Sequence, residues 1–74
     1  MTVYLYVVEY KSKGEVDERF LDLIEEVGVD VENQINKFIP ENLEECLTDE
    51  VRETYKDLIP KLKELEGKEV ALCW

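Results

Sequence analysis

Residues 2–10, Thr-Val-Tyr-Leu-Tyr-Val-Val-Glu-Tyr, alternate between two kinds of side chain. Successive side chains of a β-strand point to opposite faces, so this alternation predicts a strand. One face would be aliphatic and would carry Val3, Leu5 and Val7. The other would carry Val8 and three phenol rings, those of Tyr4, Tyr6 and Tyr10. The pattern therefore indicates a core on one side of the strand and an amphipathic, aromatic surface on the other.

A helical period follows this strand. Residues 11–14, Lys-Ser-Lys-Gly, have the composition of a turn, and Ser12 and Glu15 have the spacing of a helix capping box. From there to Gly28, apolar residues recur at helical intervals, at Val16, Phe20, Leu23, Ile24 and Val27. We therefore predict a helix that starts near Glu15 and is capped by Gly28. Its opposite face would be acidic and would carry Glu15, Glu18, Asp22, Glu25 and Glu26, with Arg19 at the edge.

Residues 29–39 fit a short helix better than a strand, because their apolar residues are spaced at helical intervals and Asp30 is a plausible N-cap. Pro40 then ends this helix or lies in the first turn of the next. Residues 43–47 predict a helix of one or two turns, with Glu41, Glu44 and Glu45 on its outer side.

Thr48 is a good N-cap for the longest predicted helix, since Asp49 and Glu50 would follow at the positive end of the helix dipole. Pro60 should kink this helix or split it near Ile59, and Gly67 should end it. Residues 68–74 alternate again and predict a second strand.

Together these elements predict a small single α+β domain over residues 1–74, in the order β-α-α-α-β. A two-stranded sheet would be covered on one face by three to four helices. If the long helices alternate in direction, the second strand runs parallel to the first, and a strand edge stays open to another chain. The expected core comprises Val3, Leu5, Val7, Phe20, Ile24, Ile35, Leu58, Leu62 and Leu72.

The chemistry that catalysis usually requires is sparse in this sequence. It contains no histidine, so the commonest general base and metal ligand is missing. Cys46 and Cys73 form no Cys-x-x-Cys pair, and we expect two small buried thiols in a reducing environment, with a disulfide between them as the alternative. We expect neither an enzyme nor a bound cofactor or metal.

The net charge of −10 arises from 19 acidic and 9 basic residues, and it is unevenly distributed. Residues 15–53 hold fourteen acids against Arg19, Lys37 and Arg52, a charge of −11, whereas the remainder carries +1. Such charge disfavours direct binding to nucleic acids or anionic membranes. The first apolar run resembles no signal peptide and no stretch could span a bilayer, so we expect a cytoplasmic protein.

Two functions fit this charge pattern. The alternative is that the acidic surface has no specific partner and only keeps the protein soluble. The first is a binding module that occupies the basic groove of a nucleic-acid-handling protein and inhibits it. Its contact residues would be acidic, namely Glu15, Glu18, Asp22, Glu25, Glu26, Asp30, Glu32, Glu41, Glu44, Glu45, Asp49 and Glu50. The second is an assembly protein that forms a homodimer or hetero-complex through Tyr4, Tyr6 and Tyr10. In composition, though in no motif, the chain is like phage-encoded inhibitors such as anti-CRISPR proteins.

Overall fold

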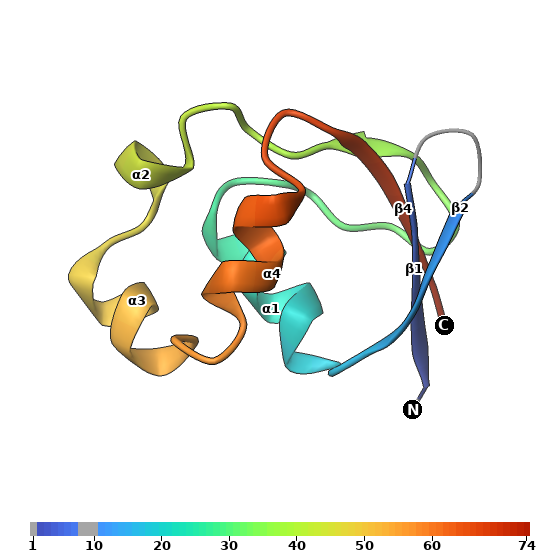
Figure 1. Ribbon diagram of the computed structural model, residues 1–74, viewed down its shortest axis with the longest axis horizontal. Helices are drawn as coiled ribbons and strands as arrows, with labels where there is room; N and C mark the ends of the chain where they lie inside the picture. The colour runs from blue at the N-terminus through green and yellow to red at the C-terminus, as the bar shows by residue number, and fades with distance from the viewer. Residues whose placement is uncertain (1, 8–10) are drawn as a thin grey trace.

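One antiparallel sheet of four strands, in the order β2-β1-β4-β3, organises the part of the chain that the structure describes (Figure 1). The computed structural model describes residues 2–7 and 11–74, with the backbone alone at position 11. Central β1 (Val3–Val7) pairs with β2 (Lys11–Val16) on one side and with β4 (Glu69–Cys73) on the other. Edge strand β3 (Lys37–Phe38) pairs with β4. The predicted two-stranded sheet is therefore wrong, and so is the parallel direction of its strands.

The second strand, β2, replaces the turn and capping box that were predicted around Ser12. Between Leu5 and Tyr6 the register shifts, so that Lys13 is the extra residue of a β-bulge. Gly14 adopts a left-handed φ of 84° there, a conformation that glycine reaches without steric cost. Ser12 Oγ accepts a hydrogen bond from Gly14 N at 3.2 Å and so supports the bulge. Glu15 consequently lies on a strand opposite Tyr4, not on a helix.

The predicted helix over residues 29–39 is also wrong, because this segment runs beside β4. The side-chain amide of Asn33 pairs with the backbone of Trp74 as a neighbouring strand would. Its Nδ2 donates to Trp74 O at 3.2 Å, and its Oδ1 accepts from Trp74 N at 3.0 Å. Gln34 N donates to Leu72 O at 2.8 Å, with a left-handed φ of 63° at Gln34. Pairing with a distant strand satisfies the backbone groups that a helix would have satisfied locally.

Four short helices lie on one side of the sheet in the described chain: α1 (Arg19–Glu26), α2 (Leu43–Cys46), α3 (Asp49–Thr54) and α4 (Ile59–Glu64) (Figure 1). Thr48 caps α3 as predicted, since its Oγ1 accepts a hydrogen bond from Val51 N at 3.2 Å. Pro60 lies in the first turn of α4, so the long helix is split near Ile59 as expected. None of the described helices is long and apolar enough to cross a membrane.

The core lies between the sheet and the helices. The alternation of β1 is confirmed there, because Val3 and Leu5 are fully buried while Tyr4 is 44% exposed. Six of the nine predicted core residues are buried, whereas Val7 and Leu58 pack against the core only partly buried. Ile35, the ninth predicted core residue, is 47% exposed, whereas Ile39, which was not predicted to be in the core, is buried. Tyr6 is half-buried, and Val8 and Tyr10 lie outside the described residues.

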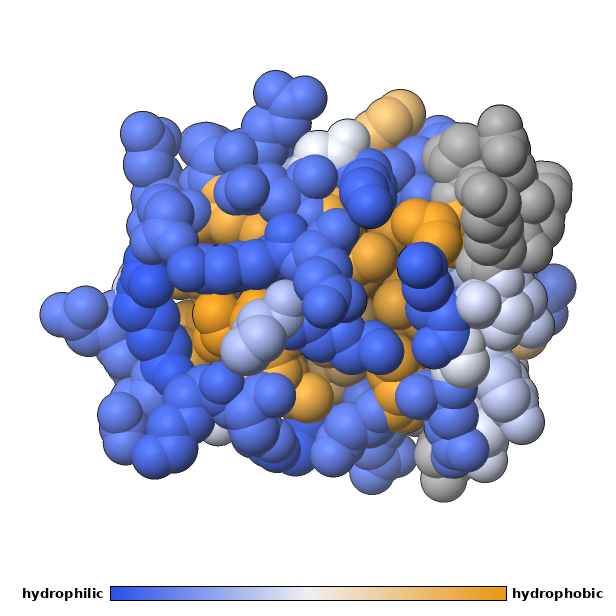
Figure 2. Space-filling model, viewed as in Figure 1, coloured by the Kyte–Doolittle hydropathy of each residue, from blue (hydrophilic) through white to orange (hydrophobic). Residues whose placement is uncertain are grey.

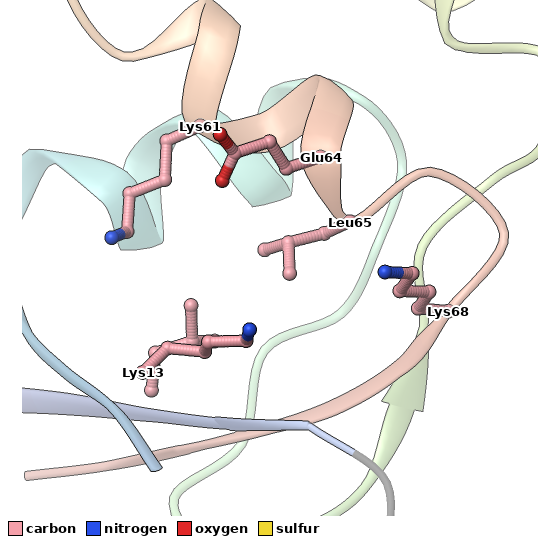
Figure 3. A pocket seen from close by; sticks show the side chains of 6 residues that line it. Lys13, Lys61, Glu64, Leu65 and Lys68 are labelled. Carbon is pink, nitrogen blue, oxygen red and sulfur yellow. The ribbon is translucent and has the colours of Figure 1, made fainter. Parts of the chain in front are cut away.

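The surface over the helices is mostly hydrophilic, with apolar atoms visible in the region of α1 and α4 (Figure 2). One hollow, of about 360 Å³, lies between α4 and the sheet. Leu5 and Leu65 contribute its apolar lining, and charged side chains surround it (Figure 3).

Replacing the fully buried Leu5 with alanine should lower the free energy of unfolding by about 2 to 5 kcal/mol, through lost burial and the cavity left behind. Ile35→Ala is the control, because this half-exposed side chain should contribute less than about 0.5 kcal/mol. Urea denaturation of both variants measures the difference. A Leu5→Ala transition that coincides with the parent's would show that the core is misassigned.

Candidate functional site

A ladder of carboxylates runs along one side of α1. Glu18 occupies the N-cap position with helical backbone angles, φ −60° and ψ −24°, so it continues the helical spacing of Asp22 and Glu26. All three side chains are exposed. Residues four apart are about 6 Å apart along a helix axis, which makes the charges regularly spaced. The predicted ladder is therefore present, although α1 is shorter than the predicted helix.

Arg19 fastens α1 to the end of α3. Its Nη1 donates to Asp57 Oδ2 at 3.0 Å, its Nη2 donates to Thr54 O at 2.8 Å, and its guanidinium lies 5.5 Å from the centre of the Tyr55 ring. Asp17 Oδ1 accepts a hydrogen bond from Arg19 N at 2.8 Å. The hydrogen bond from Arg19 lowers the pKa of Asp57 below its ordinary value. The guanidinium of Arg19 is thus occupied by contacts with the end of α3, and it forms no ion pair with the carboxylates of the ladder.

A groove of about 340 Å³ separates α1 from α3 and brings acids of both helices together. Glu26 of α1 and Glu50 of α3 line it, with hydroxyl groups from Thr48, Thr54 and Tyr55. We refer to the ladder and this groove together as the α1–α3 acidic face, defined by Glu18, Asp22, Glu26 and Glu50. Sequence periodicity could not have predicted the groove, because it depends on how two helices pack.

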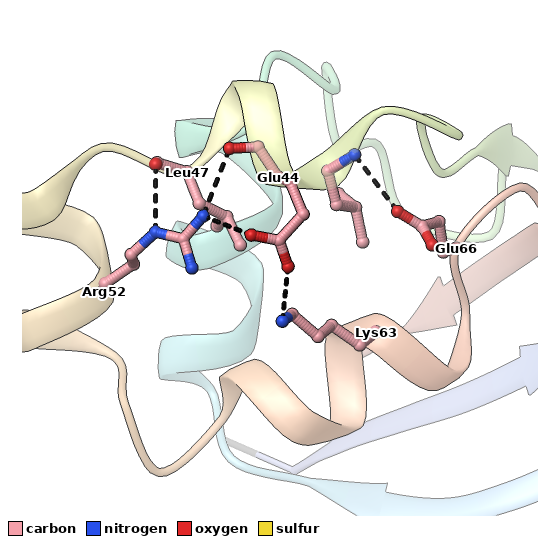
Figure 4. A network of polar contacts seen from close by, with 6 residues as sticks. Glu44, Leu47, Arg52, Lys63 and Glu66 are labelled. Atoms are coloured by element: carbon pink, nitrogen blue, oxygen red, sulfur yellow. Dashed lines mark hydrogen bonds and ion pairs between the residues drawn. The ribbon is translucent and has the colours of Figure 1, made fainter.

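The sequence predicted Glu44 as a contact residue for a partner. In the structure, its carboxylate instead forms ion pairs with two cations of the same chain (Figure 4). Arg52 Nη2 lies 2.6 Å from Oε2, and Lys63 Nζ lies 2.5 Å from Oε1. Arg52 also donates to Leu47 O at 3.2 Å and to Glu44 O at 3.1 Å. Hydrogen bonds from Lys63 and then Arg52 lower the pKa of Glu44 to about 2. Glu44 therefore links α2 to α3 and α4.

The remaining predicted acids are distributed over several elements. Glu25 is exposed on α1, Asp30 is exposed after it, and Asp49 is exposed in the first turn of α3. Other predicted acids make contacts of their own. Glu32 lies 3.6 Å from Lys37 Nζ, Glu45 accepts from Asn42 Nδ2 at 3.2 Å, and Glu41 lies against Gly67. Glu15 is on β2, so the twelve acids do not form one continuous helix surface.

The outer face of the sheet is a second candidate surface. A hollow of about 300 Å³ on it is lined by Tyr6, Gln34, Asn36, Ala71 and Cys73. Tyr4 lies beside Cys73 in the register of β1 and β4. Phe38 of β3 lies opposite Glu69 of β4 and is 68% exposed. The sequence predicted the tyrosines here, but it missed Phe38 because its segment was assigned to a helix.

Among residues 2–7 and 11–74, no group of three or more potential ligands is placed to hold a metal ion. Cys46 and Cys73 are both free and half-buried, so the alternative of a disulfide is wrong. No protein-family model, curated protein or solved structure matches this chain. Function must therefore be inferred from the charges and contacts of its own residues.

The ion pairs of Glu44 should make stability depend on pH in a defined window. Its pKa is about 2 when folded, against an ordinary 4.5, so its stabilising contribution is present above pH 4.5 and is lost as pH falls toward 2. Glu44→Gln should therefore lower the melting temperature at pH 7, and its difference from the parent should shrink across that window. Thermal melts over this pH range measure it.

Glu53→Gln is the matched control, because Glu53 is exposed on α3 and forms no ion pair with the described residues. It removes the same charge without removing the network. If both variants followed the same pH dependence, the Glu44 network would contribute nothing specific.

Proposed function

We propose that the protein is a small, non-enzymatic acidic module that occupies the basic, nucleic-acid-binding groove of a protein partner and thereby inhibits it. The α1–α3 acidic face would make the contact. The observation that carries this proposal is the exposed ladder of Glu18, Asp22 and Glu26, which Glu50 extends across the groove. Opposite charge would then guide both the approach and the orientation of the partners.

Charge density explains why two helices are needed. The ladder carries one charge per about 6 Å, whereas a DNA strand carries one per about 3.4 Å, so one helix supplies only about half the density. Glu50 lines the same groove as Glu26 and adds charge beside the ladder. The second helix therefore brings the surface closer to a phosphate backbone.

The contacts of Arg19 favour a preorganised surface. Because Arg19 joins α1 to Thr54 and Asp57, the two helices that carry the acids are held in one arrangement before a partner arrives. Binding then loses less conformational freedom than binding by a flexible acidic tail. Affinity should depend strongly on salt, since exposed charges are screened over about 8 Å at physiological ionic strength.

Triple reversal of the ladder, Glu18→Lys with Asp22→Lys and Glu26→Lys, should abolish binding while leaving the fold intact, because all three side chains are exposed. Immobilised parent and variant proteins are used to capture partners from a lysate, and the captured protein is then purified. Competition with duplex DNA and with RNA, at several salt concentrations, tests whether the ladder occupies its nucleic-acid groove.

A matched control changes net charge equally elsewhere: Glu15→Lys on β2, Glu45→Lys on α2 and Glu64→Lys on α4, all exposed. The partner should be retained by this control, lost by the ladder variant and displaced by nucleic acid. A partner that binds the ladder variant as tightly as the parent, or that ignores both salt and nucleic acid, would refute the proposal.

The outer face of the sheet supports a second candidate function, assembly into a homodimer or hetero-complex. Tyr4 and Phe38 stay 44% and 68% exposed, and aromatic residues are enriched at interfaces. Both edges of β1 are occupied by neighbouring strands, so association would use the face of the sheet and not the edge of β1.

Light scattering over a concentration series tests the homodimer form of this second function. The parent should approach twice the monomer mass, and the Tyr4→Ser, Tyr6→Ser variant should stay monomeric, because two rings of the interface are removed. Tyr4→Ser alone is included, since Tyr6 is half-buried and its loss could disturb the sheet. A parent that stays monomeric at the highest concentration would exclude self-association through this face.

A further inference from the structure

Three lysines surround the hollow between α4 and the sheet (Figure 3). Lys13 comes from the bulge of β2, Lys61 from α4, and Lys68 from the turn before β4. Glu64 is the acidic residue of the lining, so the charged groups around the hollow sum to +2. This is a local excess of positive charge in a chain whose net charge is −10.

The other cations explain why this excess is informative. Arg19, Lys37, Arg52 and Lys63 each pair with a carboxylate, as described above. By contrast, Lys13, Lys61 and Lys68 form no ion pair with a carboxylate of the described residues, and neither does Lys56, which lies outside the hollow. Like charges around one hollow repel one another, and an anion in the hollow would relieve that repulsion.

The dipole of α4 explains the position of Lys61 but not that of Lys13. Lys61 lies in the last turn of α4, where a cation favourably meets the negative end of the helix dipole. Lys13 belongs to the sheet on the opposite side of the hollow, so the end of α4 does not explain its position. What the three lysines share is the hollow itself, and an anion bound there would contact all of them.

We propose that this hollow binds the phosphate group of a small anionic ligand. Each ammonium group offers three rotatable donors and acts as a point charge, and lysines bind phosphate in this way in many proteins. The volume of about 360 Å³ is sufficient for a phosphate with a small organic group. Beneath the charged groups, the lining includes the buried apolar side chains of Leu5 and Leu65.

Glu64 gives the site a distinctive signature. Its carboxylate shares the lining with the lysines and must repel a bound phosphate. Glu64→Gln should tighten phosphate binding severalfold. Lys13→Gln, Lys61→Gln and Lys68→Gln should each weaken it about tenfold, the usual effect of losing one charged hydrogen bond.

Nuclear magnetic resonance titration of the isotope-labelled full chain tests the site, with inorganic phosphate and phenyl phosphate as probes and sodium chloride holding ionic strength constant. Saturable shifts at Leu65 and Lys68 are expected. Equal affinity for both probes would identify the free anion as the ligand, and tighter phenyl phosphate binding would identify a phosphate monoester.

Lys56→Gln is the control, because Lys56 is exposed and lies outside the hollow. It should leave affinity unchanged, and a thermal melt of each variant shows that the fold persists. Shifts that do not saturate, an equal loss with Lys56→Gln, or weaker binding with Glu64→Gln would overturn the phosphate site.

Discussion

A single apolar layer has to hold together a chain whose net charge is −10. The inner faces of β1 and β4 supply Val3, Leu5, Val70 and Leu72 to this layer, and the helices add the rest of the buried cluster. Self-repulsion of the acids opposes compactness, while apolar burial contributes about 25 cal/mol per Å². The order of the sheet matters for this balance, because it places the two most apolar strands side by side at its centre.

Cations are scarce in this chain, and two groups of them stand out among the described residues. Some act at junctions between elements: Arg19 joins α1 to the end of α3, while Arg52 and Lys63 converge on Glu44 of α2. Each junction neutralises an acid that would otherwise repel its neighbours. The second group, Lys13, Lys61 and Lys68, lines the hollow beside α4. The acidic face and the basic hollow are therefore separate features of one small domain.

Local patterns were sufficient to predict the elements that local interactions determine. Alternation revealed β1 and β4, Thr48 marked the start of α3, and Pro60 marked the break before α4. Residues 11–16 and 29–39 were misassigned because their backbone groups pair with strands elsewhere, which overrides helical spacing. The candidate site divides in the same way. The ladder follows from helical period, whereas the pairing of Glu44, the groove at Glu50 and the lysine hollow depend on contacts between distant segments.

The contacts of Arg19 limit which residues could replace it. Both of its Nη groups donate to the Asp57 carboxylate, and Nη2 also donates to Thr54 O, while its flat guanidinium lies over the Tyr55 ring. A lysine would conserve the charge, but its compact ammonium cannot combine the flat stacked surface with the same pair of directed donors. Net charge, the most conspicuous property of this sequence, is therefore a poor guide to tolerated exchanges. At position 19, the shape of the side chain and the direction of its donors decide whether the contact between α1 and the end of α3 is kept.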